Sequence, residues 1–208
     1  MRITEFVQCT DFPCVEARQE SYYVPDLEVD PSSIRLMLIS ETAATISSDN
    51  YYAGNDAMFA STTLQAFREA GLNACSIPEL LHHGVYLTTA VKCGKYDYAV
   101  ATTTIAHCSV LLERELAHFP EVRAYLLMGD VAIKVFNTIA RRQGEPRPIP
   151  AGSTYKIRGG VFTYRGKRVF PSYLQAGPSF GIEKSKQRMI AQDIANAIKG
   201  TGLEGMST

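Results

Sequence analysis

Residues 34–40, IRLMLIS, form an apolar run that is too short for a typical helix and is bounded by polar residues. Such a run is typical of a strand that is buried on both faces. Two similar runs follow, at 85–91 and 124–128, and helical patterns stand between and after them, at about 56–70, 103–118 and 130–140. Strands that alternate with helices predict a mainly parallel sheet covered on both sides.

The last third of the chain continues this pattern. Residues 143–152 carry three prolines and predict a loop. Residues 154–173 predict a hairpin, with a turn at Gly159-Gly160 or Arg165-Gly166, that leads into a fourth core strand. An amphipathic helix is expected over 182–199, and the tail 201–208 is expected to be disordered. We therefore predict an α/β fold: one domain over residues 1–200, a three-layer α/β/α sandwich with a central, mainly parallel four-stranded sheet.

Composition places few limits on function. A chain of 208 residues can bury one sizeable core. No apolar run reaches membrane-spanning length, and the N-terminal segment lacks the layout of a signal peptide. We expect a cytoplasmic protein that does not bind a membrane, and we expect a monomer.

The five cysteines fall into two close pairs and one single residue. Cys9 and Cys14 lie near the start, Cys93 and Cys108 in the middle, and Cys75 between the pairs. In a cytoplasmic protein, such pairs are more often metal ligands or catalytic groups than disulfides. Four thiolates that converge on one site favour a structural metal centre. Cys75 is expected to be a small buried apolar residue.

The zero net charge conceals an asymmetry. Residues 1–130 contain 8 Lys and Arg against 17 Asp and Glu, whereas residues 131–208 contain 13 against 4. A basic half of this kind is typical of a surface that contacts a phosphate backbone, although a solvated, charge-balanced surface would give the same count. We expect Arg165, Lys167 and Lys184 to contact DNA.

In an open α/β sheet, ligands bind beyond the carboxyl ends of the strands. Short polar segments stand at these places in the sequence: 40–44, 88–89, 129–130 and 173–175. Five segments that include them resemble, in order and interval, the motifs of the iron–sulfur (family 4 type) uracil-DNA glycosylases: LMLISETAA (36–44), NYYAG (50–54), VYLTTAVKC (85–93), LLMGDVA (126–132) and VFPSYLQAGPSF (169–180). The collinearity of the five segments over nearly the whole chain is more specific than any one of them.

The resemblance implies a [4Fe–4S] cluster held by Cys9, Cys14, Cys93 and Cys108, with a structural role. This chain departs from the family in having four residues, rather than two, between the first two cysteines. Zinc and free thiols therefore remain alternatives to the cluster.

The resemblance also implies a pocket for a base that is flipped out of DNA. Its catalytic residues would be Glu41, at the water or the sugar, and Gln175, as a donor to the departing base. Its base-contacting residues would be Thr42, Tyr52, Thr89, Tyr173 and Leu174, with Tyr52 stacking on the base. Two structural alternatives stay open: Glu41 as a carboxylate at a helix N-terminus, and Tyr52 as an ordinary core or rim aromatic.

Two positions depart from the family in chemistry. Thr89 replaces an Asn that reads the polar edge of uracil, and one hydroxyl cannot span both atoms of that edge. Leu174 replaces a His that donates to the departing base, and loss of such a donor typically costs roughly 10²–10³ in rate. The sequence thus leaves an atypical DNA glycosylase, a catalytically inactive nucleic-acid-binding module and, last, an unrelated nucleotide-binding α/β enzyme.

Overall fold

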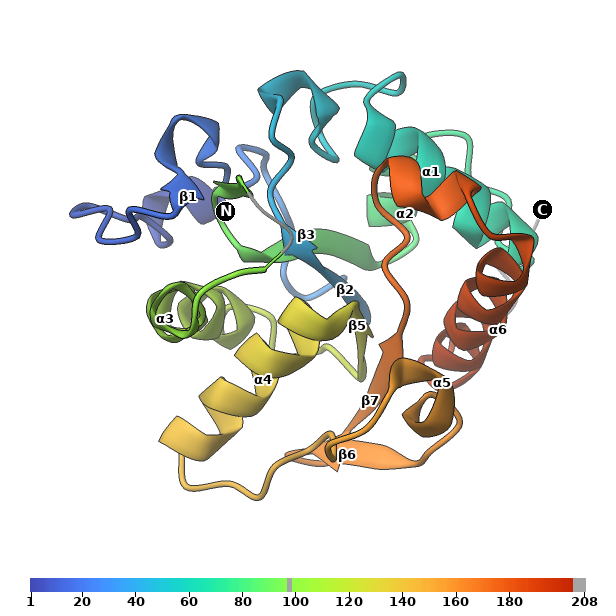
Figure 1. Cartoon of the computed structure of the whole chain (residues 1–208). Helices are drawn as coiled ribbons and strands as arrows, with labels where there is room; N and C mark the ends of the chain where they lie inside the picture. Colours follow the sequence, from blue (N-terminus) through green and yellow to red (C-terminus); the bar gives the residue numbers. More distant parts are fainter. Residues whose placement is uncertain (97–98, 204–208) are drawn as a thin grey trace.

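The computed structural model describes residues 1–96 and 99–203. The chain forms three layers (Figure 1). Helices α3 (Thr102–Ala117) and α4 (Asp130–Arg142) cover one face of the central sheet, and α1 (Met58–Glu69), α2 (Ile77–His82) and α6 (Lys184–Lys199) cover the other. The predicted three-layer α/β fold is confirmed.

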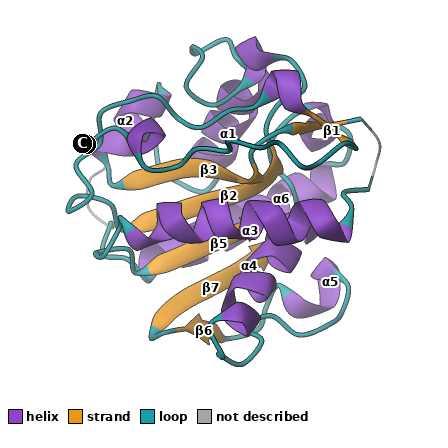
Figure 2. Ribbon diagram, turned by 90° about the vertical axis from the view of Figure 1, so that its left-hand side faces the viewer, coloured by secondary structure: helices purple, strands orange, loops and turns teal. Residues whose placement is uncertain are grey.

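The central sheet has five strands in the order β3-β2-β5-β7-β6, which are stacked from top to bottom in Figure 2. Four of them are mutually parallel: β2 (Leu36–Thr42), β3 (Val85–Val91), β5 (Ala124–Met128) and β7 (Lys167–Ser172). The fifth, β6 (Phe162–Tyr164), is antiparallel to β7 and forms one edge. The prediction of four strands was one strand short, because the first arm of the expected hairpin also joins the sheet.

The hairpin itself is shorter than predicted. Its turn is at Arg165-Gly166, one of the two alternatives, and both residues have positive φ. The start of the expected hairpin is instead a single helical turn, α5 (Thr154–Ile157).

The apolar runs are strands because both of their faces are covered. On the α3/α4 face, Met37 and Ile39 of β2 pack in one cluster with residues of these helices. On the other face, Leu36 and Leu38 pack in a second cluster with α1 and α6. That second cluster also contains Leu203, and Thr201 is buried. The packed chain therefore extends into the expected tail as far as residue 203, while 204–208 lie outside the described residues.

An N-terminal arm lies beside α3 and the end of β3. It contains the short helices η1 (Ile3–Glu5) and η2 (Gln19–Ser21) and the two-residue strand β1 (Ala17–Arg18). β1 pairs with β4 (Gly94–Lys95) to form a separate antiparallel sheet. Because β4 directly follows Cys93, this pairing brings the start of the chain to the carboxyl end of β3.

The connections change direction at β2. The chain passes from β2 to β3 on one side of it and then returns to β5 on its other side. In open α/β sheets the crevice at such a reversal is the usual ligand site. Two short helices, η3 (Ser47–Asp49) and η4 (Pro178–Gly181), lie in the loops that leave this end of the sheet after β2 and β7.

Candidate functional site

A pocket of about 990 Å³ opens at the carboxyl ends of the parallel strands. Its walls come from the loop after β2, the start of α1, the segment around β4, the first turn of α4 and the loop after β7. The lining combines apolar side chains with a few charged ones, which is typical of sites that bind small molecules or single chemical groups. Of the seven predicted catalytic and base-contacting residues, three line this pocket: Glu41, Thr42 and Leu174.

Glu41 is held between a helix and a lysine. Its Oε1 accepts a hydrogen bond from the backbone N–H of Val131 in the first turn of α4, at 3.2 Å. Its Oε2 lies 3.3 Å from Nζ of Lys95. Gly129 makes room for it, since a Cβ atom there would stand 2.5 Å from Oε1. The alternative of a carboxylate at a helix N-terminus is therefore correct for Glu41, and the same carboxylate also lines the pocket.

An aromatic side chain that the sequence analysis did not single out lines the pocket. Phe59, the second residue of α1, is partly buried, and its ring lies 5.4 Å from the ring of Tyr51. Met58 is 38% exposed and also lines the pocket. The only indication of Phe59 in the sequence was its position at the start of α1, just after the loop that follows β2.

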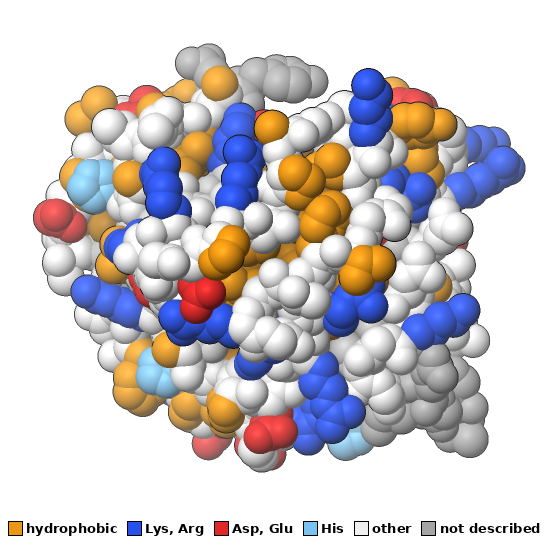
Figure 3. Space-filling view, turned by 90° about the horizontal axis from the view of Figure 1, so that it is seen from below, with side chains coloured by type: hydrophobic (Ala, Val, Ile, Leu, Met, Phe, Trp, Pro, Cys, Tyr) orange, Lys and Arg blue, Asp and Glu red, His pale blue; other side chains and the backbone are white. Residues whose placement is uncertain are grey.

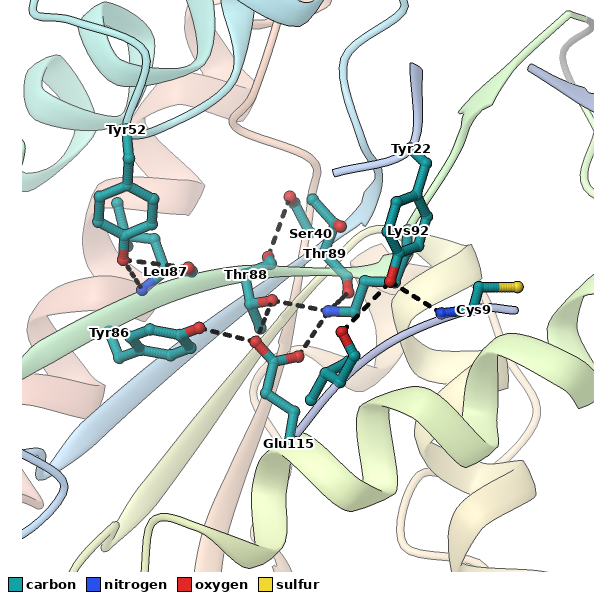
Figure 4. Close-up of polar contacts among 11 residues, drawn as sticks. Cys9, Tyr22, Ser40, Tyr52, Tyr86, Leu87, Thr88, Thr89, Lys92 and Glu115 are labelled. Atoms are coloured by element: carbon teal, nitrogen blue, oxygen red, sulfur yellow. Dashed lines mark hydrogen bonds and ion pairs between the residues drawn. The ribbon is translucent and has the colours of Figure 1, made fainter. Parts of the chain in front are cut away.

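Tyr52 has a structural role in this conformation. Its hydroxyl donates to the carbonyl of Leu87 at 3.1 Å and accepts from the N–H of Leu87 at 3.0 Å (Figure 4). β3 is an edge strand, so these two bonds satisfy backbone groups that have no partner strand. Tyr52 does not line the pocket, and the alternative of a rim or core aromatic describes it.

Thr89 and Gln175 are buried on the α1 side of the sheet and do not line the pocket. Thr89 lies opposite Ser40 in the β2–β3 register. The amide nitrogen of Gln175 donates to the Tyr51 hydroxyl at 2.9 Å, which in turn donates to Ser40 Oγ at 2.7 Å. Because Gln175 is 0% exposed, it does not reach a ligand in the pocket as the structure stands.

Tyr173 and Lys184, the other two predicted site residues near this end of the sheet, do not line the pocket. Tyr173 packs against the second cluster, with the Lys186 ammonium 5.5 Å from the centre of its ring. Lys184 is exposed at the first position of α6. α6 follows the loop that leaves the carboxyl end of β7, so Lys184 is on the pocket side of the molecule.

Arg165 and Lys167 lie at the opposite end of the sheet. Arg165 lies in the β6–β7 turn and Lys167 directly follows it, and the register pairs Arg168 with Ala124 at the start of β5. Arg165 forms an ion pair with Glu145 at 3.2 Å, and Lys167 Nζ donates to the carbonyl of Pro120. The structure does not bring these two residues to the pocket.

The molecule can be viewed from the side where β6 forms the sheet edge. Lys and Arg side chains surround an apolar strip on this face, and Asp and Glu are few (Figure 3). The positive charges are spread over the face rather than aligned in one stripe. Basic side chains therefore predominate over acidic ones on this face.

The four paired cysteines meet at a second cavity. Cys9, Cys14, Cys93 and Cys108 all line a space of about 220 Å³ between the N-terminal arm, the end of β3 and α3. Burial raises the pKa of the Cys93 thiol to about 12 and that of Cys108 to about 11, and neighbouring cysteines add to both shifts. Cys75, by contrast, is exposed, so the prediction of a buried apolar residue was wrong.

Two properties of the cavity bear on which metal group it would hold: the kind of ligand atoms and the distances between them. Among residues 1–96 and 99–203, no three Cys, His, Asp or Glu side chains lie close enough to share one metal ion. A single zinc ion needs its ligand atoms at about 2.0–2.3 Å. An iron–sulfur cluster keeps its four thiolates apart, because each binds a different iron. Four thiols around one cavity supply the soft ligand atoms that an iron–sulfur cluster or a zinc ion takes, and the choice between the two stays a prediction.

A buried ion pair lies beside this cavity, and one of its members, Lys92, lines the cavity. Lys92 and Glu115 are both 0% exposed, and Lys92 Nζ lies 2.5 Å from Glu115 Oε2. The ammonium also donates to Thr88 Oγ1 and the Thr89 carbonyl, and Glu115 accepts from Tyr86 and Thr88 (Figure 4). All three ammonium protons therefore have partners, as a buried charge requires.

Comparisons with known proteins agree with the motifs. A type-5 uracil-DNA glycosylase of Thermus thermophilus is 32% identical over 96 residues, which cover 44% of this chain and 44% of the relative. The alignment thus spans less than half of that relative's length, and the likeness to the family 4 type stays a prediction. In the described part of the chain, no helix has the length and apolar character to cross a membrane. The family described as "Uracil DNA glycosylase superfamily" matches residues 28–192, and the chain therefore belongs to that superfamily.

Proposed function

We propose that this protein binds DNA and hydrolyses the N-glycosidic bond of a uracil-like or modified base that is flipped into the pocket at the carboxyl ends of β2, β5 and β7. The observation that carries the proposal is the pocket itself. In a member of this superfamily, a pocket of about 990 Å³ at the topological reversal holds a carboxylate beside an apolar wall.

The lining offers two of the functions that base excision needs. Phe59 and Leu174 provide apolar surface for a base, with Phe59 as the stacking aromatic in place of Tyr52. Glu41 provides a fixed carboxylate that stabilises the positive charge on the sugar and orients a water molecule. Its attachment to Val131 and Lys95 keeps it in place while the bond breaks.

We also propose that Cys9, Cys14, Cys93 and Cys108 hold a [4Fe–4S] cluster through their thiolates. When bound, the cluster joins the N-terminal arm to the core through two thiolates on each side. This role is structural, since Cys9 and Cys14 lie on the arm and Cys93 and Cys108 on the core.

A second function, a DNA-binding module without hydrolysis, is favoured by one observation. Tyr52 and Gln175, two residues predicted to act on the base, use their polar groups within the protein. A pocket that retains its shape but lacks a donor to the departing base would bind an extruded base without releasing it.

Oligonucleotides that carry uracil, hypoxanthine, xanthine or an alkylated base, each single- and double-stranded, distinguish the two functions. Incubation with purified protein and then with alkali cleaves the strand wherever a base has been released. We expect release of at least one base, and an E41Q variant should release it roughly 10²-fold more slowly. Variant E69Q, at the exposed end of α1, is the matched control because it removes the same charge, and K199Q, at the exposed end of α6, is the control for loss of a positive charge. DNA binding without release from any substrate would establish the second function instead.

A further inference from the structure

The pocket contains a lysine whose place the family motifs did not reveal. Lys95 lines the pocket with Glu41, and the two side chains are 31% and 13% exposed. Nζ lies 3.3 Å from Glu41 Oε2. Glu41 is thus one of the partners of the Lys95 ammonium group. The pair thus presents a cation and a carboxylate to the same space.

The backbone of Lys95 is fixed from the opposite side. Lys95 is the second residue of β4 and pairs with Ala17 of the N-terminal arm. Gly94 donates its N–H to Ser21 Oγ at 2.8 Å, and a Cβ atom at Gly94 would stand only 2.6 Å from that oxygen. The close approach that glycine allows therefore anchors β4 to the arm. Glu41 is anchored independently by α4, so the two charges meet across the pocket from separate supports.

The departing base needs a donor, and the residues predicted for this task do not supply one. Leu174 has no polar atom, and the Gln175 amide nitrogen already donates to Tyr51 and to Thr63. In the described lining of the pocket, the cationic side chains are Lys95 and Lys134. Lys134 pairs with Asp130, and these side chains are 55% and 67% exposed, which places them at the open rim. Lys95 is the more enclosed of the two.

We propose that Lys95 is a catalytic residue that donates a hydrogen bond to the base as it leaves as an anion. This inference rests on the proposed hydrolysis. The bond between C1′ and the base nitrogen breaks, and its electron pair stays on the base. The water oxygen forms the new bond to C1′ and passes a proton to Glu41, and solvent returns a proton to the base. Lys95 lowers the energy of the negative charge, and Glu41 that of the positive charge on the sugar.

The test uses the acidity of the leaving base. Single-turnover release is measured for wild type, K95Q, K95R and the control K199Q, on DNA with uracil and on DNA with 5-fluorouracil. Fluorine makes the base a better anion, so it depends less on a donor. We expect K95Q to slow uracil release roughly 10²-fold and 5-fluorouracil release distinctly less. K95R, which keeps the charge, should recover part of the rate. If the wild type releases only purines, hypoxanthine and the more acidic xanthine replace the two pyrimidines.

The outcomes separate this inference from the proposed function. Equal losses on both bases would show that Lys95 only holds the pocket together and would overturn its catalytic role. An unchanged rate in K95Q would do the same, while leaving hydrolysis established. If the wild type releases no base at all, the proposed function fails and this inference fails with it. Melting temperatures of all variants confirm that each is folded at the assay temperature.

Discussion

The cysteine cavity and the pocket at the carboxyl ends of the strands differ in size and in the side chains that line them. The cavity is small, about 220 Å³, and segments from the N-terminus and the middle of the chain converge on it. The pocket is more than four times larger and opens to solvent between loops. The residues proposed as ligands in the cavity are all thiols. The pocket instead combines apolar, acidic and basic groups, so its chemistry depends on which way each side chain points.

This difference explains why one region was easier to predict than the other. All four cysteines predicted as ligands line one cavity. At the pocket, adjacent residues of a strand point to opposite faces, so an error of one residue moves a side chain out of the site. Thr88 turns towards α3 and contacts Glu115, while Thr89 faces the α1 side. A motif match fixes the position of a residue but not the direction of its side chain.

The largest effect is expected at the cysteine cavity. In C108S, one of four thiolate ligands is lost, and the iron content should fall from about four per chain in the wild type to below one. Iron and sulfide analysis, with the brown absorbance of the purified protein, measures this. C75S is the matched control because Cys75 is exposed and outside the cavity, and it should keep its full iron. A colourless wild type that contains zinc would contradict the cluster.

The next largest effect is expected at the buried ion pair between Lys92 and Glu115, beside the cysteine cavity. K92M leaves the Glu115 carboxylate buried without its cation, and the free energy of unfolding should fall by about 3–5 kcal/mol. The double variant K92M/E115Q removes both charges and should recover much of this loss. Urea denaturation of the metal-free chains measures all three. A loss of less than about 1 kcal/mol in K92M would show that the pair is not buried as the structure indicates.

The fold was more predictable than the site because burial leaves a pattern in the sequence and side-chain direction does not. The expected strands 85–91 and 124–128 coincide with β3 and β5, since both are buried throughout and consist mostly of apolar residues. The prediction failed at the start of the expected hairpin, which is the helical turn α5. No alternation of apolar and polar residues there distinguishes a strand from a helix. Lys95 was missed because its role depends on the pairing of β4 with β1, two short segments 75 or more residues apart in the sequence.

Phe59 and Tyr52 are the two candidates for the aromatic side chain that stacks on the base, and one variant of each residue distinguishes between them. F59L keeps an apolar side chain but removes the ring that lines the pocket. Loss of stacking should cost about 1–3 kcal/mol, or roughly 5- to 150-fold in the rate of base release. Single-turnover kinetics on the substrate that the panel identifies measures it. An unchanged rate in F59L would remove Phe59 from the base site.

Y52F is the complementary variant, because it keeps the ring and removes the hydroxyl. The N–H and carbonyl of Leu87 then lose their partner at the edge of β3. We expect the free energy of unfolding to fall by about 1–2 kcal/mol, with the rate of release by folded protein unchanged. If Y52F instead slows release and leaves stability intact, the hydroxyl contacts the substrate in the DNA complex, and the bonds to Leu87 are exchanged on binding.

The smallest expected effect concerns which of the two ends of the sheet contacts DNA. K184E reverses a charge on the pocket side, and the dissociation constant for DNA should rise by roughly three- to tenfold at about 0.1 M salt. R165E reverses a charge at the far end, where Arg165 already pairs with Glu145, and should change affinity less than about twofold. Fluorescence anisotropy over a series of salt concentrations measures both, and the slope of the logarithm of affinity against the logarithm of salt should become shallower only in K184E. Equal effects of the two variants would mean that DNA contacts the basic face as a whole. DNA bound only at the pocket end would not be affected by a change at Arg165, which lies at the far end of the sheet.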